Sequence, residues 1–338
     1  MLLKSQLAAL PRISLAHLPT PLEELDKLSK HLGGPKLLVK RDDLTGLATG
    51  GNKTRKLEFL MAEALAQRSD SVITAGGPQS NHCRQTAAAA ARLGLECHLV
   101  LGDQPAQEAG NLLLDELLGA KLHWVPKSDR DARMQTLAGE LRQQKRHPYV
   151  IPVGGSNACG ALGYVVAMAE LMEQLDAQQL QVDHIVFPTS SGGTQAGMVL
   201  GAQLVGFRGQ ITAISVDQIP DEQVPEENRS ERFIEEVCRV ANGSAALLGV
   251  TQRLEVEQFS TCYDYLGDGY GVLGDLEREA IKLLARHEGM LVGPVYSGRA
   301  LGGLIDQIRK KVYSSNQTVL FWHTGDETAL HAYRDELL

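Results

Sequence analysis

The strongest constraint on the fold is an alternation, along almost the whole chain, of short β-branched segments with longer amphipathic segments. The short segments have the length and composition of strands rather than of buried helices. Strands that are separated by helices predict parallel sheets with helices on both faces, and therefore an α/β fold. We expect strands at residues 36–41, 71–76, 97–102, 121–126, 148–153, 183–189, 211–217 and 318–324.

The intervening segments predict amphipathic helices at 55–67, 83–93, 104–118, 129–145, 160–175 and 275–287. Periodicity alone leaves open whether the strands form one sheet or two. Glycine-rich and polar clusters follow nearly every expected strand and precede a helix. Ligands of open α/β sheets bind at this carboxyl edge, so these clusters are the candidate functional segments.

Charge and composition exclude several classes of function. The net charge of −8 provides no positive field that would attract nucleic acid or an anionic membrane. The five cysteines are scattered, without a C-x-x-C pair or a zinc spacing, and are expected to be reduced thiols with no bound metal. No segment approaches the ~20 apolar residues of a membrane span, and the first residues lack a signal-peptide core. We expect a cytoplasmic protein, with two domains over its 338 residues.

The first cluster, TGGNKTRK at 49–56, places Lys53 at the start of a helix. The helix N-terminus, together with Arg55 and Lys56, disfavours a protonated amine there, as a lysine that forms a Schiff base requires. A lysine on a flexible surface loop is the alternative. A nucleotide-binding P-loop is disfavoured, because Asn52 separates the last glycine from Lys53.

The second cluster, SSGGTQAG at 190–197, follows a strongly apolar strand. Its glycines, hydroxyls and helix N-terminus are suited to binding a phosphate. A simple strand-to-helix turn is equally compatible with this pattern. A dinucleotide site that uses Asp217 is a further alternative, although the glycine spacing is not G-x-G-x-x-G. The candidate phosphate ligands are Ser190, Ser191, Gly192, Gly193 and Thr194.

The remaining clusters are individually weak. In GGPQSNHCRQ at 76–85, Ser80 and Asn81 have the positions of helix caps, and capping is the ordinary role of such residues. GGSNACGALG at 154–163 has the same form and the same ambiguity. The tyrosines of GDGYGV and GPVYSGRA, Tyr270 and Tyr296, could equally be packed rings.

Taken together and in order, seven motifs resemble the 1-aminocyclopropane-1-carboxylate deaminase and D-cysteine desulfhydrase family. The resemblance covers nearly the whole chain and implies a fold-type-II pyridoxal-phosphate enzyme like tryptophan synthase β, with two open, mostly parallel sheets. It also implies a homodimer, a large domain of residues 1–55 plus 161–338, and a small domain of residues 56–160. The motifs are GGNKTRKLEFL, GGPQSNHCRQTAAAAARLGL, VGGSNACGALGY, SGGTQAGMV, GYGV, GPVYSGRALGGLID and VLFWHTG.

The resemblance also implies roles for individual residues. Lys53 would hold the cofactor as a Schiff base, and Asn81 would face the 3-hydroxyl of the cofactor. Ser80 would meet the substrate carboxylate, and Tyr270 and Tyr296 would flank the substrate and orient it or transfer protons. Lys56 and residues 190–194 would surround the phosphate, Thr324 would contact the cofactor, and His82 and Ser297 would contact the substrate.

Ser297, Thr324 and His82 resemble the desulfhydrase branch, because the deaminases carry Glu, Leu and Gln there. A hydroxyl beside the pyridine nitrogen can only hydrogen-bond a neutral ring, whereas a carboxylate can keep the nitrogen protonated. This favours β-elimination over cyclopropane opening, with an amino acid, D-cysteine first, giving pyruvate, ammonia and hydrogen sulfide. Deaminase or L-cysteate sulfo-lyase activity uses the same machinery. A nicotinamide-dependent oxidoreductase and a catalytically silent binding protein are more distant alternatives.

Two positions depart from the desulfhydrase pattern. Asp326 stands where the desulfhydrases usually have Gly, and Gln195 matches the deaminases. Asp326 could cap the last helix, or it could place a negative charge near the cofactor and alter which β-substituent is accepted.

Overall fold

The computed structural model describes residues 6–7, 9–102, 104, 109–217 and 226–338. Their strands form two sheets, one of six strands and one of four. In the six-stranded sheet all neighbours are parallel except β1 and β2, which are antiparallel. Its strands, in spatial order, are β1 (Leu22–Glu24), β2 (Lys36–Arg41), β10 (Thr318–His323), β7 (His184–Thr189), β8 (Gln210–Ser215) and β9 (Ser260–Cys262).

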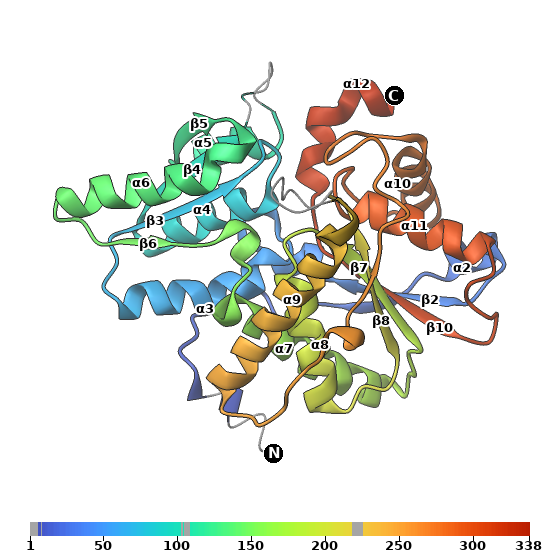
Figure 1. Ribbon diagram of the computed structural model, residues 1–338. Helices are drawn as coiled ribbons and strands as arrows, with labels where there is room; N and C mark the ends of the chain where they lie inside the picture. The colour runs from blue at the N-terminus through green and yellow to red at the C-terminus, as the bar shows by residue number, and fades with distance from the viewer. Residues whose placement is uncertain (1–5, 8, 103, 105–108, 218–225) are drawn as a thin grey trace.

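The four-stranded sheet is parallel throughout and is built from one continuous stretch of the chain. Figure 1 shows it on the left, with the six-stranded sheet on the right. Its strands, in spatial order, are β5 (Lys121–Val125), β4 (Glu96–Gly102), β3 (Ser71–Gly76) and β6 (Pro148–Val150).

Helices cover both faces of each sheet. The described α-helices are α2 (Asp26–Leu32), α3 (Lys53–Ala66), α4 (Asn81–Leu93), α5 (Asn111–Leu117), α6 (Arg130–Gln143), α7 (Ala158–Gln178), α8 (Gly193–Val205), α9 (Glu226–Leu248), α10 (Asp275–Glu288), α11 (Ser297–Arg309) and α12 (Arg334–Leu337). Each of these helices is too short or too polar to act as a bilayer span.

Successive side chains of β10 point to opposite faces of the large sheet, and helices pack on both faces. Phe321 points into the core under α2, α10 and α11, while its neighbours Leu320 and Trp322 point into the core under α7 and α8. All three side chains are completely buried. The small sheet follows the same rule, with α3 and α4 over one face and α6 over the other. The continuous apolar character of these strands therefore reflects burial on both faces.

The expected α/β architecture with two mostly parallel sheets is confirmed. The expected strand at 148–153 is shorter and ends at Val150, because Pro152 and the turn Val153–Gly155 follow. The expected helix at 104–118 begins only at Asn111, since Gly110 has a positive, non-helical φ; residues 103 and 105–108 lie outside the described residues. The four-stranded sheet falls within residues 56–160, while the expected domain borders fall inside α3 and α7. The division into domains stays a prediction.

Candidate active site

A cavity of about 760 Å³ opens to solvent where β3, β7, β8 and β10 end. Its walls are thus the carboxyl edges of both sheets, where the sequence places its polar clusters. Eleven of the expected site residues line it: Lys53, Ser80, Asn81, His82, Ser190, Ser191, Gly192, Thr194, Tyr270, Tyr296 and Thr324. Of the other three, Lys56 donates to Gly154 and Ser297 contacts Thr324, both of which line the cavity, while the amide of Gly193 donates to Ser156.

Lys53 is the first residue of α3, and the turn before it is fixed to both neighbouring strand ends. The amide of Gly51 donates to Asp42 O (3.0 Å), after β2, and the amide of Asn52 donates to Thr324 O (2.9 Å), after β10. Burial lowers the pKa of Lys53 to about 8. Among the described residues its amine has no hydrogen-bond or ion-pair partner. Burial therefore makes the amine available as a nucleophile or base near neutral pH.

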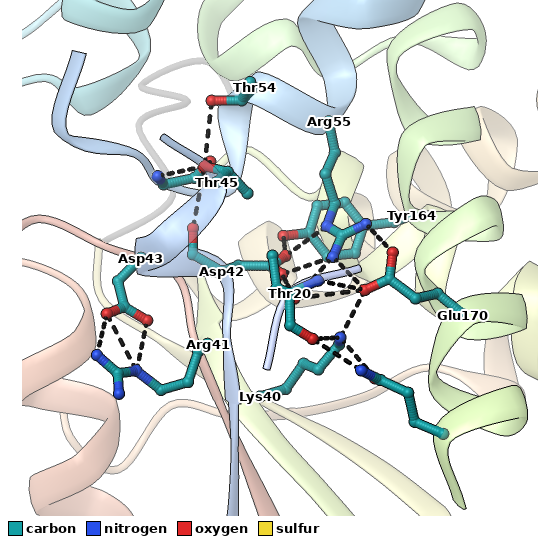
Figure 2. A network of polar contacts seen from close by, with 12 residues as sticks. Thr20, Lys40, Arg41, Asp42, Asp43, Thr45, Thr54, Arg55, Tyr164 and Glu170 are labelled. Carbon is teal, nitrogen blue, oxygen red and sulfur yellow. Dashed lines mark hydrogen bonds and ion pairs between the residues drawn. The ribbon is translucent and has the colours of Figure 1, made fainter. Parts of the chain in front are cut away.

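A buried ionic network anchors α3 directly behind Lys53 (Figure 2). Arg55 binds Asp42 (Nη2 to Oδ1, 2.8 Å) and Glu170 of α7 (Nη1 to Oε2, 3.0 Å). Lys40 of β2 also binds Glu170 (Nζ to Oε1, 2.5 Å), and the Tyr164 hydroxyl donates to Asp42 Oδ2 (2.6 Å). Burial alone would raise the pKa of Asp42, but Arg55 and then Lys40 outweigh it and hold this pKa at about 2. The network therefore stays ionised and ties α3 to β2 and α7.

The loop before α8 forms a cup of hydroxyl and amide groups. Ser156 connects its two sides: its Oγ bonds Ser191 Oγ (2.8 Å) and accepts from the amide of Gly193 (3.1 Å). A side chain at Gly193 would approach the backbone of Ser156 to 2.8 Å, so only glycine fits there. Lys56 donates to Gly154 O (3.0 Å) and lies near Ser156 Oγ (3.4 Å). Such a cup at a helix N-terminus suits a phosphate group.

The N-terminus of α4 forms a second wall of the cavity. Ser80 caps the helix by accepting from the amide of Cys83 (3.3 Å), as its position indicated, and it also lines the cavity. The side-chain oxygen of Asn81 accepts from Arg84 (3.2 Å) and Asn111 (3.0 Å). Its amide nitrogen has no partner within the described part of the chain and remains available as a donor.

His82 is neutral in this wall. Its Nε2 bonds the Thr74 hydroxyl at 2.8 Å, and its Nδ1 is buried without a partner among the described residues. Burial, and then the charges of Lys53 and Lys56, hold the pKa of His82 well below its usual range. His82 therefore adds no positive charge to the cavity.

Tyr270 and Tyr296 form the opposite wall. Their hydroxyls are hydrogen-bonded to each other, and their rings meet edge to face with centroids 5.7 Å apart. Burial raises the pKa of both phenols, so both remain protonated near neutral pH. Beside them, Ser297 Oγ donates to Gly325 O (2.7 Å) and lies 3.2 Å from Thr324 Oγ1. This places two hydroxyl groups side by side at the end of β10.

Several residues of the site were not anticipated. Ser156 was signalled only by the ambiguous GGSN motif, and Lys127 and Arg130 at the cavity wall by no motif. Asp217, considered as a ribose ligand, also lines the cavity and pairs with Lys127 at 3.5 Å. Arg299 of α11 holds the chain around Tyr270 through the carbonyls of residues 266, 269 and 272.

One group of side chains away from the wall has the residue types of a metal site. Ligand atoms of Asp43, His323 and Glu327 lie within 4.8 Å of one another. Asp43 is already paired with Arg41 (2.6 Å), however, and both ring nitrogens of His323 have backbone partners. We assign no metal to this group.

Comparison with known proteins agrees with this geometry. Residues 13–325 match the family described as pyridoxal-phosphate dependent enzyme. The D-cysteine desulfhydrases of Salmonella typhi and Salmonella schwarzengrund are each 41% identical to the chain over 334 residues, covering 97% of both proteins. A crystal structure of an ACC deaminase homologue matches with a TM-score of 0.88 and 34% identity, over 99% of this chain and 98% of that one.

More distant structures share the fold. A threonine deaminase from T.th. is 18% identical and superimposes with a TM-score of 0.66, over 96% of this chain and 97% of that one. The expected fold-type-II architecture is thereby confirmed. The free amine of Lys53, the phosphate cup and the hydroxyl pair at Thr324 fit the aldehyde, the phosphate and the ring of pyridoxal phosphate. The chain belongs to the pyridoxal-phosphate dependent enzymes.

Proposed function

We propose that the protein is a lyase that converts D-cysteine and water to pyruvate, ammonia and hydrogen sulfide. The observation that carries this proposal is the pair of hydroxyls, Ser297 and Thr324, beside a cavity that also holds a free lysine amine. The similarity to D-cysteine desulfhydrases over almost the whole chain supports it.

The cavity offers a separate group for each part of the cofactor. We propose that Lys53 forms the covalent bond to the aldehyde, that residues 190–194 with Ser156 hold the phosphate, and that the free amide nitrogen of Asn81 donates to the 3-hydroxyl. Bound pyridoxal phosphate supplies an electron-withdrawing ring that stabilises negative charge at the α-carbon of an amino acid. Ser297 and Thr324 would set the polarity around the ring nitrogen.

The substrate would lie between two walls with different chemistry. The N-terminus of α4, with Ser80 as its cap, presents N–H groups and a hydroxyl to the substrate carboxylate. The amine of Lys53, whose pKa is near 8, accepts the α-proton once it is free. The protonated hydroxyls of Tyr270 and Tyr296 orient the substrate and can return a proton to a leaving group.

Ser297 and Thr324 would present two neutral hydroxyls to the ring nitrogen, and this would favour the easier of the candidate reactions. Without a carboxylate beside it, the nitrogen would not be held protonated, and the ring would withdraw electrons less strongly. Expelling hydrosulfide from the β-carbon requires only modest stabilisation of the α-carbanion, whereas opening a cyclopropane requires more. The hydroxyl pair therefore supports sulfide elimination over deamination of 1-aminocyclopropane-1-carboxylate.

The central test replaces Lys53. In Lys53→Ala, sulfide release from D-cysteine should fall by about 10²–10⁴-fold or more, because the protein loses both the covalent anchor and the base. Lys282→Ala, at an exposed position on α10, is the matched control and should retain activity. Borohydride reduction and mass spectrometry should locate the phosphopyridoxyl group on the peptide that contains Lys53. Active protein with an unmodified Lys53 peptide would contradict the proposal.

Substrate choice needs a separate experiment. D-cysteine, L-cysteine, L-cysteate and 1-aminocyclopropane-1-carboxylate are supplied in parallel, and pyruvate, 2-oxobutyrate, sulfide and sulfite are measured. We expect pyruvate and sulfide from D-cysteine. Formation of 2-oxobutyrate alone would show that the hydroxyl pair does not exclude the deaminase reaction.

We also propose, from the family resemblance, a homodimer located in the cytoplasm, with the small domain at 56–160 and the large domain at 1–55 plus 161–338. Light scattering of the purified protein tests the oligomeric state. Native-state hydrogen exchange tests the division, because the two domains should open as separate cooperative units.

A further inference from the structure

Asp326, which stands where a glycine is usual in the desulfhydrases, is completely buried in the turn after β10. Its φ of 86° lies in the left-handed region, which is strained for a residue other than glycine. A residue that is both strained and charged needs strong local partners to persist. Its carboxylate has three such contacts, all on one short segment of the chain.

These contacts are backbone amides at the start of α11. Asp326 Oδ1 accepts from the amide of Gly293 (2.9 Å), and Oδ2 accepts from the amides of Tyr296 (2.7 Å) and Ser297 (3.4 Å). No basic side chain forms an ion pair with Asp326 within the described ranges. The first residues of α11 have no side-chain cap of their own, because the N-cap position is occupied by Tyr296. Asp326 therefore caps α11 from a distance of some 30 residues along the chain.

The backbone of Asp326 also packs closely against the segment before α11. A Cβ atom on Gly293 would approach Asp326 O to 2.0 Å, so the turn before α11 lies directly against the turn after β10. Tyr296 is held in this contact by its own amide, while its hydroxyl reaches Tyr270 at the cavity wall. A shift of the amide would be transmitted to the phenol.

We propose that Asp326 is a positioning residue that fixes Tyr296, and with it the Tyr270–Tyr296 hydroxyl pair, by capping α11. The positioning of Tyr296 by Asp326 does not depend on the proposed function. Its importance for catalysis does rest on the proposed function. Asp326 touches neither the substrate nor the cofactor in this proposal. It acts through the backbone of α11.

The cap responds to pH. Burial, and then the charge of Glu327, raises the pKa of Asp326 to about 7 against the opposing effect of the amide donors. The other ionisable groups that face it are His323 on its own segment, Arg84 of α4, Tyr296 of α11 and Tyr333. Because this pKa is raised in the folded state, the capped structure favours the protonated carboxyl, and ionisation above pH 7 favours opening of the cap. The hydroxyl pair should therefore be best ordered below pH 7.

Two substitutions separate the cap from the charge. Asp326→Asn keeps an acceptor and removes the titration, while Asp326→Gly relieves the strained φ and removes the cap. Asp335→Asn, at an exposed position on α12, is the control. The first measurement is amide hydrogen exchange by mass spectrometry on the peptides that span 290–300, without substrate. Exchange in Asp326→Gly should be at least 10-fold faster than in the wild type, and in the control it should be unchanged.

The second measurement is pH dependence. After correction for intrinsic exchange rates, protection of the 290–300 peptides in the wild type should decrease between pH 6 and pH 8, and in Asp326→Asn it should stay constant. The pH dependence of kcat/KM for D-cysteine near pH 7 should flatten in Asp326→Asn in the same way, mainly through kcat. This comparison remains decisive if Asp326→Gly fails to fold.

The outcomes distinguish the inference from the proposed function. Unchanged exchange in Asp326→Gly, or identical pH dependence of protection in the wild type and Asp326→Asn, would overturn the positioning role. Loss of protection in a protein that does not act on D-cysteine would leave the positioning role intact and refute the proposed function instead.

Discussion

The cavity is supported from behind by two completely buried aspartates with contrasting surroundings. Asp42, behind Lys53, is bound by Arg55, and its pKa lies at about 2. Asp326, behind Tyr296, is bound among the described residues by backbone amides alone, and its pKa lies at about 7. Both side chains have an exposed fraction of 0%. The difference shows that partners, rather than burial, decide whether a buried carboxyl is charged at neutral pH.

The contrast has a functional side. The lysine that we propose as anchor and base rests on a network in which Asp42 stays ionised above pH 4, whereas the tyrosine pair rests on a group that titrates near pH 7. The buried carboxyl behind Lys53 is therefore insensitive to physiological pH, and the one behind Tyr296 responds to it.

Removing the charge of Asp42 should have the largest effect on the free energy of unfolding. Asp42→Asn leaves Arg55 and Lys40 with less negative charge in a buried network, and such a loss costs about 3–5 kcal/mol of unfolding free energy. Urea denaturation at pH 7.5 measures it. A loss below about 1 kcal/mol would show that Glu170 alone compensates both cations.

The pH dependence of stability should have opposite signs at the two sites. The pKa of Asp326 is raised in the folded state, so its contribution to stability is largest below pH 4 and is lost as the pH rises to about 7. The free energy of unfolding of Asp326→Asn, relative to the wild type, should therefore increase from pH 4.5 to pH 8, by at most about 4 kcal/mol.

Asp42 behaves in the opposite way. Its pKa is lowered, so its contribution is complete above pH 4 and is lost as the pH falls toward 2, with an upper limit of about 2.5 kcal/mol. Denaturant titrations of the wild type and both Asn variants across this range compare the two sites. Slopes of the same sign would remove the distinction between them.

A smaller effect on stability, with a clear effect on catalysis, is expected for Arg299. Its guanidinium, paired with Glu277, donates to the carbonyls of Leu266 (2.7 Å), Gly269 (2.9 Å) and Val272 (2.7 Å), which surround Tyr270. Arg299→Lys should lose about 1.5–3 kcal/mol of stability and, because Tyr270 is less well placed, lower kcat about 10-fold. Arg309→Lys, on the exposed face of the same helix, is the control and should change neither quantity.

The smallest effect is expected where an ion pair is exposed. Glu236 and Arg239 on α9 are 2.6 Å apart, with side chains 54% and 73% exposed. Glu236→Gln should change the unfolding free energy by less than about 0.5 kcal/mol. A larger change would mean that exposure is a poor guide to the strength of ion pairs in this protein.

Much of the fold could be predicted because its central strands are apolar on both faces. The expected segments 36–41 and 71–76 coincide with β2 and β3. The strands β1 and β9 have three residues each at the edges of the large sheet, and they form only through pairing with β2 and β8. Such short segments carry no periodic signal, so the sequence alone does not indicate them.

The glycine-rich turns of the candidate site could be predicted from the sequence, but the residues that hold the site in place could not. Glycine-rich turns after strands are local signals, and they placed Lys53 and residues 190–194 at the cavity. Ser156, Arg299 and Asp326 form these hydrogen bonds with residues that are 27 to 37 positions away in the sequence. No local sequence pattern indicates such pairings. For Asp326 the sequence left a cap of the last helix and a charge near the cofactor as alternatives. The expected cap of the last helix is wrong, because the side chain makes no cap bond to the helical turn Glu327–Tyr333 that follows it and caps α11 instead.

The order of strands in the large sheet has a consequence for how the chain is made. β10 (residues 318–323) lies between β2 and β7 and pairs with both. On the ribosome, β2 must therefore wait until residues 318–323 emerge before it can pair with β10, while the four strands of the small sheet are already complete. The newly made protein exposes an apolar strand edge until then, which is the interval in which chaperones would be needed most.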